Sequence, residues 1–355
     1  MTTYLLAGGG TAGHVNPLLA LADRIRLREP EAEIVVLGTA EGLEARLVPE
    51  RGYELSTIER LPFPRRPNGY ALTFVPRYLR AIREVRALIR DRRVDVVVGF
   101  GGYASAPAYR AAAREGVPIV IHEANARPGM ANKLGARSTD HVAVTFAGTP
   151  IKGARVTGMP LRPEIEQLDR DALRAEARAH FGFDEAKPLL LVTGGSLGAR
   201  ALNQGISPLA QEIVDAGAQV LHVWGGLTEV VDPGVPGYQV IEYCDRMDLA
   251  LASCDLAVSR AGSTTVSELA GLGIPAVFVP LEHGNGEQRL NASGVVDAGG
   301  ALMVSESELT PEWVRSTLIP LLSDDARLAE MSKLGRSAGS LEGTERLYEM
   351  VQAAL

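Results

Sequence analysis

Two glycine-rich segments, one near each end of the chain, each follow a short apolar run and precede a helical pattern. The first covers residues 7–14 (AGGGTAGH) and the second covers residues 193–200 (TGGSLGAR). A strand that turns sharply through glycines into a helix points backbone N–H groups, and the positive end of the helix, at whatever lies beyond it. Such a turn suits a phosphate or another anion. Its presence twice predicts two similar nucleotide-binding-type domains, with a substrate held in the cleft between them.

Short β-branched runs alternate with helix-length segments in both halves of the chain. Several of these runs, such as residues 4–7, 94–100 and 188–193, are mostly apolar, which is typical of parallel strands buried on both faces. Helices between parallel strands form right-handed crossovers. We therefore expect an α/β fold of two Rossmann-like, doubly wound parallel-sheet domains that face each other across a cleft.

The length of 355 residues is large for one hydrophobic core, so we expect two domains. Two prolines interrupt regular structure in residues 158–163 (GMPLRP), which predicts the boundary there. The first domain is expected in residues 1–158 and the second in residues 159–340. An amphipathic C-terminal helix in residues 341–355 could pack back on the first domain.

Charge and cysteine content exclude several classes of protein. The formal net charge of −7 argues against general nucleic-acid binding. Cys244 and Cys254 are the two cysteines, too few for a disulfide framework or a cysteine metal cluster, which favours a reducing cytosol. No apolar run reaches the roughly 18 residues of a transmembrane helix, and the N-terminus lacks the pattern of a signal peptide. We expect only peripheral contact with a membrane.

The first loop also fits the G-x-G-x-x-G spacing of dinucleotide-binding proteins, through Gly8, Gly10 and Gly13. That fingerprint needs an acidic residue near the end of the second strand, where it binds the ribose hydroxyls. Here the second strand ends in residues 38–40 (GTA), and Glu41 lies past the turn. A nicotinamide-dependent oxidoreductase is therefore disfavoured.

His14 is a candidate for chemistry because it stands beside the first loop, at the start of the following helix. The positive end of that helix favours the neutral, basic imidazole. One interpretation is a general base. The alternative is a histidine that caps the turn or binds an anion.

Three later segments carry polar or glycine-rich turns after predicted strands. Residues 99–105 could line an acceptor site or form a plain turn. In residues 259–268 a helix begins with hydroxyls and Glu268, whose carboxylate could bind a ribose diol or serve the helix start. Residues 280–291 offer Gln288 and Asn291, whose carboxamides both donate and accept, as sugar hydroxyls require, unless this is a surface loop.

The ordered set of segments resembles one family of bacterial glycosyltransferases. The matching segments are residues 8–14, 99–103, 122–125, 158–162, 194–200, 260–268 and 288–291, which together span nearly the whole chain. The family adds N-acetylglucosamine to the lipid-linked muramyl-pentapeptide of cell-wall synthesis and produces lipid II. The resemblance implies the GT-B fold, UDP-N-acetylglucosamine (UDP-GlcNAc) as donor, undecaprenyl-linked lipid I as acceptor, and inversion at the anomeric carbon. It also implies an acceptor side in the first domain, a donor side in the second, and a peripheral location on the cytoplasmic side of the membrane with other cell-wall synthesis proteins.

By the same resemblance, His14 would take the proton from the muramyl 4-hydroxyl, Glu268 would bind the ribose, and Gln288 would bind the sugar hydroxyls. The donor-binding residues would be Thr11, Ala12, Gly13, Asn125, Arg162, Ser196, Cys244, Glu268 and Gln288, and the phosphate loops would contain Gly10, Gly194 and Gly195. The second loop and Arg162 would stabilise the charge that develops on the UDP leaving group. Such a site could dispense with a divalent metal, so we expect no cofactor, and the acidic residues in 169–171 are interpreted as a helix cap.

The chain departs from the commoner family residues at Ala12, Met159, Cys244 and Glu287. The carboxylate of Glu287 can accept hydrogen bonds from a sugar but cannot donate them. Two alternatives keep parts of the pattern: a UDP-GlcNAc 2-epimerase of the same fold, and a non-catalytic nucleotide-sugar-binding protein.

An undecaprenyl acceptor lies in a membrane, so the segment from Arg65 to Arg93 is a candidate docking surface. It holds nine arginines against Glu84 and Asp91. A basic helical face attracts an anionic membrane surface. Apolar residues are expected to divide between shallow insertion (Phe63, Leu72 and Phe74) and the protein core (Val75, Leu79, Ile82, Val85 and Ile89).

Overall fold

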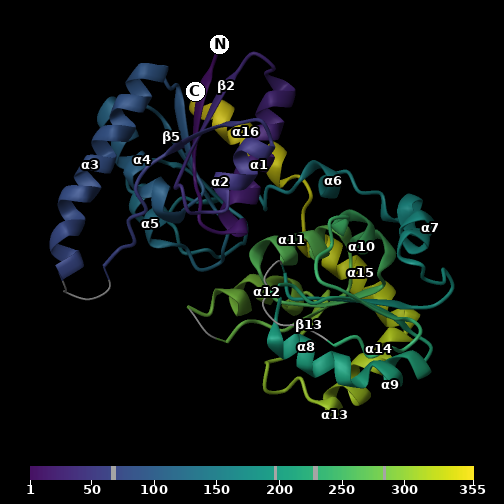
Figure 1. Ribbon diagram of the computed structural model, residues 1–355. Coiled ribbons are helices and arrows are strands. Elements are labelled where there is room, and N and C mark those ends of the chain that lie inside the picture. The colour runs from purple at the N-terminus through teal and green to yellow at the C-terminus, as the bar shows by residue number, and fades with distance from the viewer. Residues whose placement is uncertain (65–68, 196–197, 227–230, 283–284) are drawn as a thin grey trace. The chain divides into compact units, whose positions relative to one another are not determined.

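The computed structural model describes residues 1–64, 69–195, 198–226, 231–282 and 285–355. The chain forms two compact units, which we name the first unit (Met1–Arg162 with Glu342–Leu355) and the second unit (Pro163–Leu341) (Figure 1). Each unit contains one sheet, and all neighbouring strands in both sheets are parallel. The prediction of two Rossmann-like parallel-sheet domains is confirmed.

The first unit is built on a seven-stranded sheet of order β3-β2-β1-β4-β5-β6-β7. Its strands are β1 (Thr3–Ala7), β2 (Glu33–Gly38), β3 (Glu54–Thr57), β4 (Val96–Gly99), β5 (Ile119–Glu123), β6 (His141–Val144) and β7 (Arg155–Val156). Its helices are α1 (Ala12–Arg28), α2 (Glu44–Glu50), α3 (Gly69–Arg92), α4 (Gly102–Glu115), α5 (Met130–Gly135) and α16 (Gly343–Ala354).

Helices cover both faces of this sheet, which explains why its central strands are apolar throughout. Along β1, Leu5 and Ala7 pack into a core shared with α3 and α4. The alternating residues Tyr4 and Leu6 pack into a second core with α1 and α16. The period of two along a strand therefore fills two cores from one short segment.

The last helix of the chain, α16, belongs to the first unit and lies beside α1 (Figure 1). Leu347, Met350 and Val351 are buried in the core beneath it. At its start, the Thr344 hydroxyl oxygen accepts a hydrogen bond from the N–H of Leu161 at 3.2 Å. This contact fixes the segment that ends with Arg162.

The second unit is built on a six-stranded sheet of order β10-β9-β8-β11-β12-β13. Its strands are β8 (Leu189–Thr193), β9 (Gln219–Val223), β10 (Tyr238–Ile241), β11 (Leu256–Ser259), β12 (Ala276–Phe278) and β13 (Ala301–Met303). Its longer helices are α7 (Arg170–Phe181), α8 (Arg200–Ile206), α10 (Met247–Ser253), α11 (Ser263–Leu272), α12 (Glu287–Asp297) and α15 (Asp325–Ala338). Shorter helical segments are α6 (Pro163–Glu166), η1 (Ser207–Leu209), α9 (Ala210–Asp215), α13 (Pro311–Trp313), η2 (Val314–Leu318) and α14 (Ile319–Leu322).

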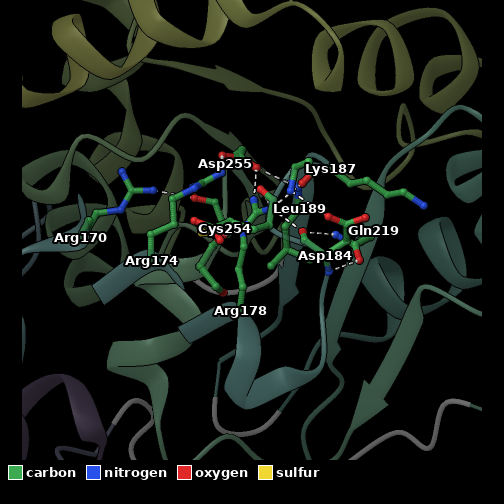
Figure 2. A network of polar contacts seen from close by, with 12 residues as sticks. Arg170, Arg174, Arg178, Asp184, Lys187, Leu189, Gln219, Cys254 and Asp255 are labelled. Carbon is green, nitrogen blue, oxygen red and sulfur yellow. Dashed lines mark hydrogen bonds and ion pairs between the residues drawn. The ribbon is translucent and has the colours of Figure 1, made fainter. Parts of the chain in front are cut away.

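A polar network lies at the amino-terminal ends of the central strands β8 and β11 (Figure 2). Asp255 Oδ2 accepts hydrogen bonds from the N–H of Leu189 at 2.8 Å and from Nη2 of the fully buried Arg178 at 2.7 Å. Arg174 Nη2 donates to the other carboxylate oxygen at 2.6 Å. Arg178 Nη1 also donates to the carbonyl oxygens of residues 184, 185 and 187. The network binds α7 and the following loop to the sheet. It lies at the opposite end of β8 from the glycine-rich loop.

The acidic residues in 169–171 form a helix cap, as expected. Asp169 precedes α7, and its Oδ1 accepts a hydrogen bond from the N–H of Ala172 at 3.0 Å. Among the residues that the structure describes, no group of three or more His, Cys, Asp or Glu side chains is arranged to hold a metal ion.

The apolar residues that helix α3 buries are not all those expected from the sequence. Phe74 is buried and packs on Phe63, with 5.2 Å between the ring centroids, so neither ring forms an exposed tip. Val75 and Leu79, expected in the core, are 57% and 40% exposed, and Leu72 is 83% exposed. In the N-terminal part of the helix only Phe74 is buried, whereas farther along Ala81, Ile82, Val85 and Ile89 are all buried.

The arginines of α3 are also less available than the sequence indicates, because carboxylates, most of them from other segments, pair with them. The pairs are Arg77 with Glu59, Arg80 with Glu84, Arg86 and Arg90 with Glu115, and Arg92 with Glu33 and Glu54. These pairs neutralise much of the predicted basic face.

Candidate active site

The predicted site residues that the structure describes lie in loops that follow the parallel strands, or in the helices to which those loops lead. Ligands of α/β proteins bind beyond the carboxyl ends of such strands. In the first unit, residues 8–11 connect β1 to α1, and residues 124–129 connect β5 to α5. In the second unit, the corresponding loops follow β8, β10, β11 and β12. Ala12, Gly13 and His14 form the first turn of α1, and Thr11 is the residue before it.

His14 is held by the backbone of its own loop. Its Nδ1 lies 3.1 Å from the carbonyl oxygen of Gly9 and 3.3 Å from the hydroxyl of Thr11. Since a carbonyl oxygen only accepts, Nδ1 carries a proton, and in the neutral ring Nε2 then has the lone pair. This tautomer is the one that a general base acting through Nε2 requires.

The β4–α4 loop packs directly against the first glycine-rich loop. A Cβ atom at Gly101 would lie 3.1 Å from Nε2 of His14, and one at Gly102 would lie 2.5 Å from the Gly9 carbonyl oxygen. Both glycines also have positive φ angles, 93° and 78°. Only glycine allows these two loops to approach so closely beside the imidazole.

Gly10 has a positive φ of 91°, but its N–H already has an anionic acceptor. Glu44 Oε2 accepts this hydrogen bond at 2.7 Å, and Glu44 Oε1 accepts from the N–H and the hydroxyl of Thr39 at 2.9 and 2.8 Å. The Glu44 side chain is fully buried. Sequence reasoning missed this residue because it examined the end of the second strand as far as Glu41, and Glu44 stands three residues later, at the start of α2.

Asn125 lies in a loop that a second buried carboxylate organises. Glu123 accepts hydrogen bonds from the N–H groups of Asn125 and Gly129, at 3.0 and 2.9 Å, and from Asn132 Nδ2 at 2.9 Å. Tyr109 in turn donates its hydroxyl to Asn132 Oδ1 at 2.7 Å. The loop that presents Asn125 is therefore fixed by the protein core.

His122 stands beside this loop, and burial lowers its pKa to about 4. Its Nε2 lies 3.1 Å from the carbonyl oxygen of Gly158, so Nε2 carries the proton. Its Nδ1 finds no hydrogen-bond partner among the described residues. The ring is therefore a neutral part of the core near the Gly158–Arg162 segment, and Arg162 itself is half-buried at the end of the first unit.

In the second unit, the loop after β8 is as constrained as the first. Gly195 and Gly198 have φ angles of 80° and 77°. The Gly195 N–H donates to the Thr193 hydroxyl at 3.2 Å, and the Gly198 N–H donates to the Gly195 carbonyl at 2.9 Å. A side chain at Gly194 would collide with the backbone of Ala199. Ser196, the predicted phosphate donor, lies outside the residues that the structure describes.

Gln288 connects two loops of the second unit. Its Oε1 accepts from the N–H of Ala261 at 3.3 Å, in the β11–α11 turn, and from the N–H of Leu281 at 3.0 Å, in the β12–α12 loop. Within the described residues its Nε2 group donates no hydrogen bond, so two donors remain for a ligand. Glu268, which is 9% exposed, lies in the helix that begins at the same turn.

Cys244 follows β10 and is almost fully buried. Burial raises the pKa of its thiol to about 11, so the residue is uncharged at neutral pH. Its side chain can contribute packing, and its backbone can contribute hydrogen bonds to a ligand.

No helix of the described residues has both the length and the apolar character of a membrane span.

Comparison with known proteins gives matches in both units. Residues 4–144 match the model of the glycosyltransferase family 28 N-terminal domain, and residues 189–347 match that of the family 28 C-terminal domain. A crystal structure of MurG from Acinetobacter baumannii has a TM-score of 0.82 and 29% identity, covering 99% of this chain and 100% of that one.

Curated relatives are similar over their full length. One from Leifsonia xyli subsp. xyli is 59% identical over 355 residues, 100% of this chain and 99% of the relative. One from Clavibacter sepedonicus is 59% identical over 356 residues, 100% of this chain and 97% of the relative. Both are named UDP-N-acetylglucosamine–N-acetylmuramyl-(pentapeptide) pyrophosphoryl-undecaprenol N-acetylglucosamine transferase. The chain therefore belongs to this family of glycosyltransferases and has its GT-B fold of two family 28 domains.

Proposed function

We propose that this enzyme transfers N-acetylglucosamine from UDP-GlcNAc to the 4-hydroxyl of the muramyl unit of undecaprenyl-pyrophosphoryl-N-acetylmuramyl-pentapeptide. The reaction converts lipid I into lipid II in peptidoglycan synthesis. The observation that carries this proposal is the 59% identity, over the whole chain, to relatives that are named for this transfer. It favours the transferase over an epimerase or a binding protein of the same fold.

The first unit would supply the general base. As the muramyl 4-oxygen bonds to the anomeric carbon, Nε2 of His14 would take the hydroxyl proton. The bond from the anomeric carbon to the phosphate oxygen breaks in the same step, and its electron pair leaves with UDP. Attack from the face opposite the leaving group inverts the anomeric centre. The tautomer fixed by the Gly9 carbonyl supports this role for His14.

The second unit would bind most of the donor. Glu268 would accept hydrogen bonds from the ribose hydroxyls, and the two Nε2 donors of Gln288 would bind the sugar hydroxyls. The backbone at Cys244 would meet the uracil. Thr11, Ala12, Gly13 and Asn125 would contribute contacts from the first unit.

Charge on the departing diphosphate would be stabilised by groups fixed before the reaction begins. Gly194, Gly195 and Ser196 would offer N–H and hydroxyl donors, and Arg162 would offer a cation. In the first loop, the N–H of Gly10 serves the protein's own Glu44, so we assign it no phosphate contact.

We also propose that the first unit docks on an anionic membrane surface, from the cytoplasmic side, to reach its lipid acceptor. Leu72, Val75 and Leu79 support this, since they follow one another at helical spacing on α3 and are 83%, 57% and 40% exposed. Because many of the arginines are paired, apolar insertion would contribute more than the charges do. Other cell-wall synthesis proteins are proposed partners on the basis of family membership alone.

Product analysis tests the proposed reaction. The protein is incubated with UDP-GlcNAc and a short-chain lipid I analogue, and the product is examined by mass spectrometry and NMR. We expect the analogue to gain one N-acetylglucosamine, β-linked to the muramyl 4-oxygen. A product in which UDP-GlcNAc has only changed its configuration at C2 would support the epimerase instead.

A further inference from the structure

The most enclosed carboxylate of the first unit lies beneath the loop that holds the proposed base. Glu44 is fully buried, and its two oxygens together accept three hydrogen bonds, from Gly10 N–H, Thr39 N–H and the Thr39 hydroxyl. Hydrogen bonds to an ionised acceptor are about twice as strong as neutral ones. This carboxylate therefore binds the β1–α1 loop to the segment that follows β2.

Three glycines leave the space that the carboxylate fills. A Cβ atom at Gly9 or Gly42 would collide with the carboxylate group, and one at Gly38 would come within 2.5 Å of Glu44 Cγ. None of these three glycines has a positive φ, so their backbone conformations do not explain the residue type. Room for Glu44 does explain it.

The hydrogen bonds continue from this carboxylate to the imidazole. Glu44 binds the N–H of Gly10, and the carbonyl of the preceding Gly9 accepts from Nδ1 of His14 at 3.1 Å. The peptide that joins Gly9 to Gly10 contains both groups, the Gly9 carbonyl and the Gly10 N–H. Because a peptide unit is planar, fixing the N–H also fixes the direction of the carbonyl.

We propose that Glu44 is a positioning residue for the transfer reaction. By fixing the peptide between Gly9 and Gly10, it keeps the proton of His14 on Nδ1 and leaves Nε2 as the base. It also occupies the Gly10 N–H, which a phosphate would otherwise find, so this donor serves the loop rather than a ligand. The catalytic part of the inference rests on the proposed function, and the tautomer part does not.

Glu44→Gln is the direct test, because the amide keeps the size of the side chain. Its Nε2 group is a donor and would face either the Gly10 N–H or the N–H of Thr39, which are donors themselves. We expect the kcat of acceptor-dependent transfer to fall about tenfold to a hundredfold, as small misplacements of a catalytic group do. The KM for UDP-GlcNAc and the affinity for UDP should change less than about twofold, within the scatter of such comparisons.

Two matched controls and one further disrupting variant separate positioning from general damage. Glu41→Gln makes the same chemical change at an exposed residue three positions earlier, and should leave kcat unchanged. Gly42→Ala keeps Glu44 but places a methyl group against its carboxylate, and should reproduce the loss of kcat even if Glu44→Gln does not fold. Gly294→Ala, where a Cβ meets no atom within 4 Å, is the control for the glycine change.

Nitrogen NMR of the imidazole rings gives a readout that needs no activity. With ¹⁵N-labelled histidine, and His14 assigned by its loss in His14→Gln, the wild-type ring should show a protonated Nδ1 and an unprotonated Nε2. Glu44→Gln or Gly42→Ala should shift His14 toward a mixture of tautomers. Wild-type kcat together with an unchanged His14 tautomer in these variants would overturn the inference. Failure of the wild-type protein to transfer sugar would instead contradict the proposed function and leave the tautomer test standing.

Discussion

The ring contacts of three histidines differ. Nδ1 of His14 lies beside the Gly9 carbonyl, Nε2 of His122 lies beside the Gly158 carbonyl, and both ring nitrogens of His222, on β9, have partners in Tyr238 and Asn203. His14 is the proposed base, through Nε2, whereas the other two rings are buried in the core. Replacing His14 with Gln should lower kcat by about a hundredfold to ten thousandfold, the usual contribution of a general base. UDP affinity, measured by calorimetry, should stay within about twofold, since the base does not hold the nucleotide. An unchanged kcat would show that His14 is not the base.

The buried histidines predict how stability depends on pH. Burial lowers the pKa of His122 and of His222 to about 4, whereas the same groups in the unfolded chain titrate near 6.5. The unfolded chain therefore binds protons first as the pH falls. The contribution of these two histidines to the free energy of unfolding is fully present above about pH 6.5 and is lost progressively toward pH 4. At pH 5 the loss is about 2 kcal/mol for each histidine. Urea unfolding at about pH 7.5 and about pH 5 measures this, and equal unfolding free energies would contradict it.

His14 and Glu44 show which parts of the candidate site can be predicted from the sequence. His14 could be proposed as a base because it stands next to its glycine loop, where a histidine has few other roles. The role of Glu44 could not be predicted, because Glu44 is 34 residues from the N–H group that it binds. An acidic residue at the start of a helix also has an ordinary local explanation, the favourable interaction with the helix dipole. Long-range hydrogen bonds of this kind leave no periodic signal in one sequence.

Among the secondary-structure elements, α7 depends on the network around Asp255 (Figure 2). Replacing Asp255 with Asn would leave the fully buried Arg178 guanidinium without its carboxylate, and should destabilise the second unit by about 3–5 kcal/mol. Urea unfolding of the full chain measures the loss. Asp171→Asn, at an exposed residue of the same helix, is the matched control. A change below about 1 kcal/mol would show that the pair is solvated like a surface ion pair.

Helix α3 tests the membrane proposal. The double variant Leu72→Ser, Leu79→Ser should reduce sedimentation with vesicles that contain anionic phospholipid, because the exposed apolar side chains of α3 are proposed to insert into the membrane. Activity toward a short-chain acceptor in detergent should be retained. Leu27→Ser, at a 70% exposed residue of α1, is the control. Equal binding of the double variant and the wild type would contradict docking through α3.

The strands were predictable because apolar runs between helical segments have few other solutions in an α/β fold. The exposure of the apolar residues at the N-terminal end of α3 could not be predicted in this way. Its apolar spacing is that of a core stripe along the full length of the helix, but before Ala81 only Phe74 is buried. Pairing of its arginines with Glu59 and Glu115 likewise depends on which segments fold beside it.

At the scale of the whole molecule, two units of similar topology each have one glycine-rich loop, and we propose different roles for the two loops. In the first unit the loop donates to Glu44 and orients His14. In the second unit the loop around Gly194 and Gly195 is proposed to meet the diphosphate. On this proposal, a duplicated fold would bind one nucleotide, through the loop of the second unit.

Acceptor-dependent release of UDP is the measurement that tests the central claim most directly. The protein is incubated with UDP-GlcNAc in EDTA, with and without a short-chain lipid I analogue. We predict that UDP appears only when the acceptor is present and that EDTA does not prevent it. Tight binding of UDP-GlcNAc without acceptor-dependent release of UDP would contradict the transferase and favour an epimerase or a nucleotide-sugar-binding protein.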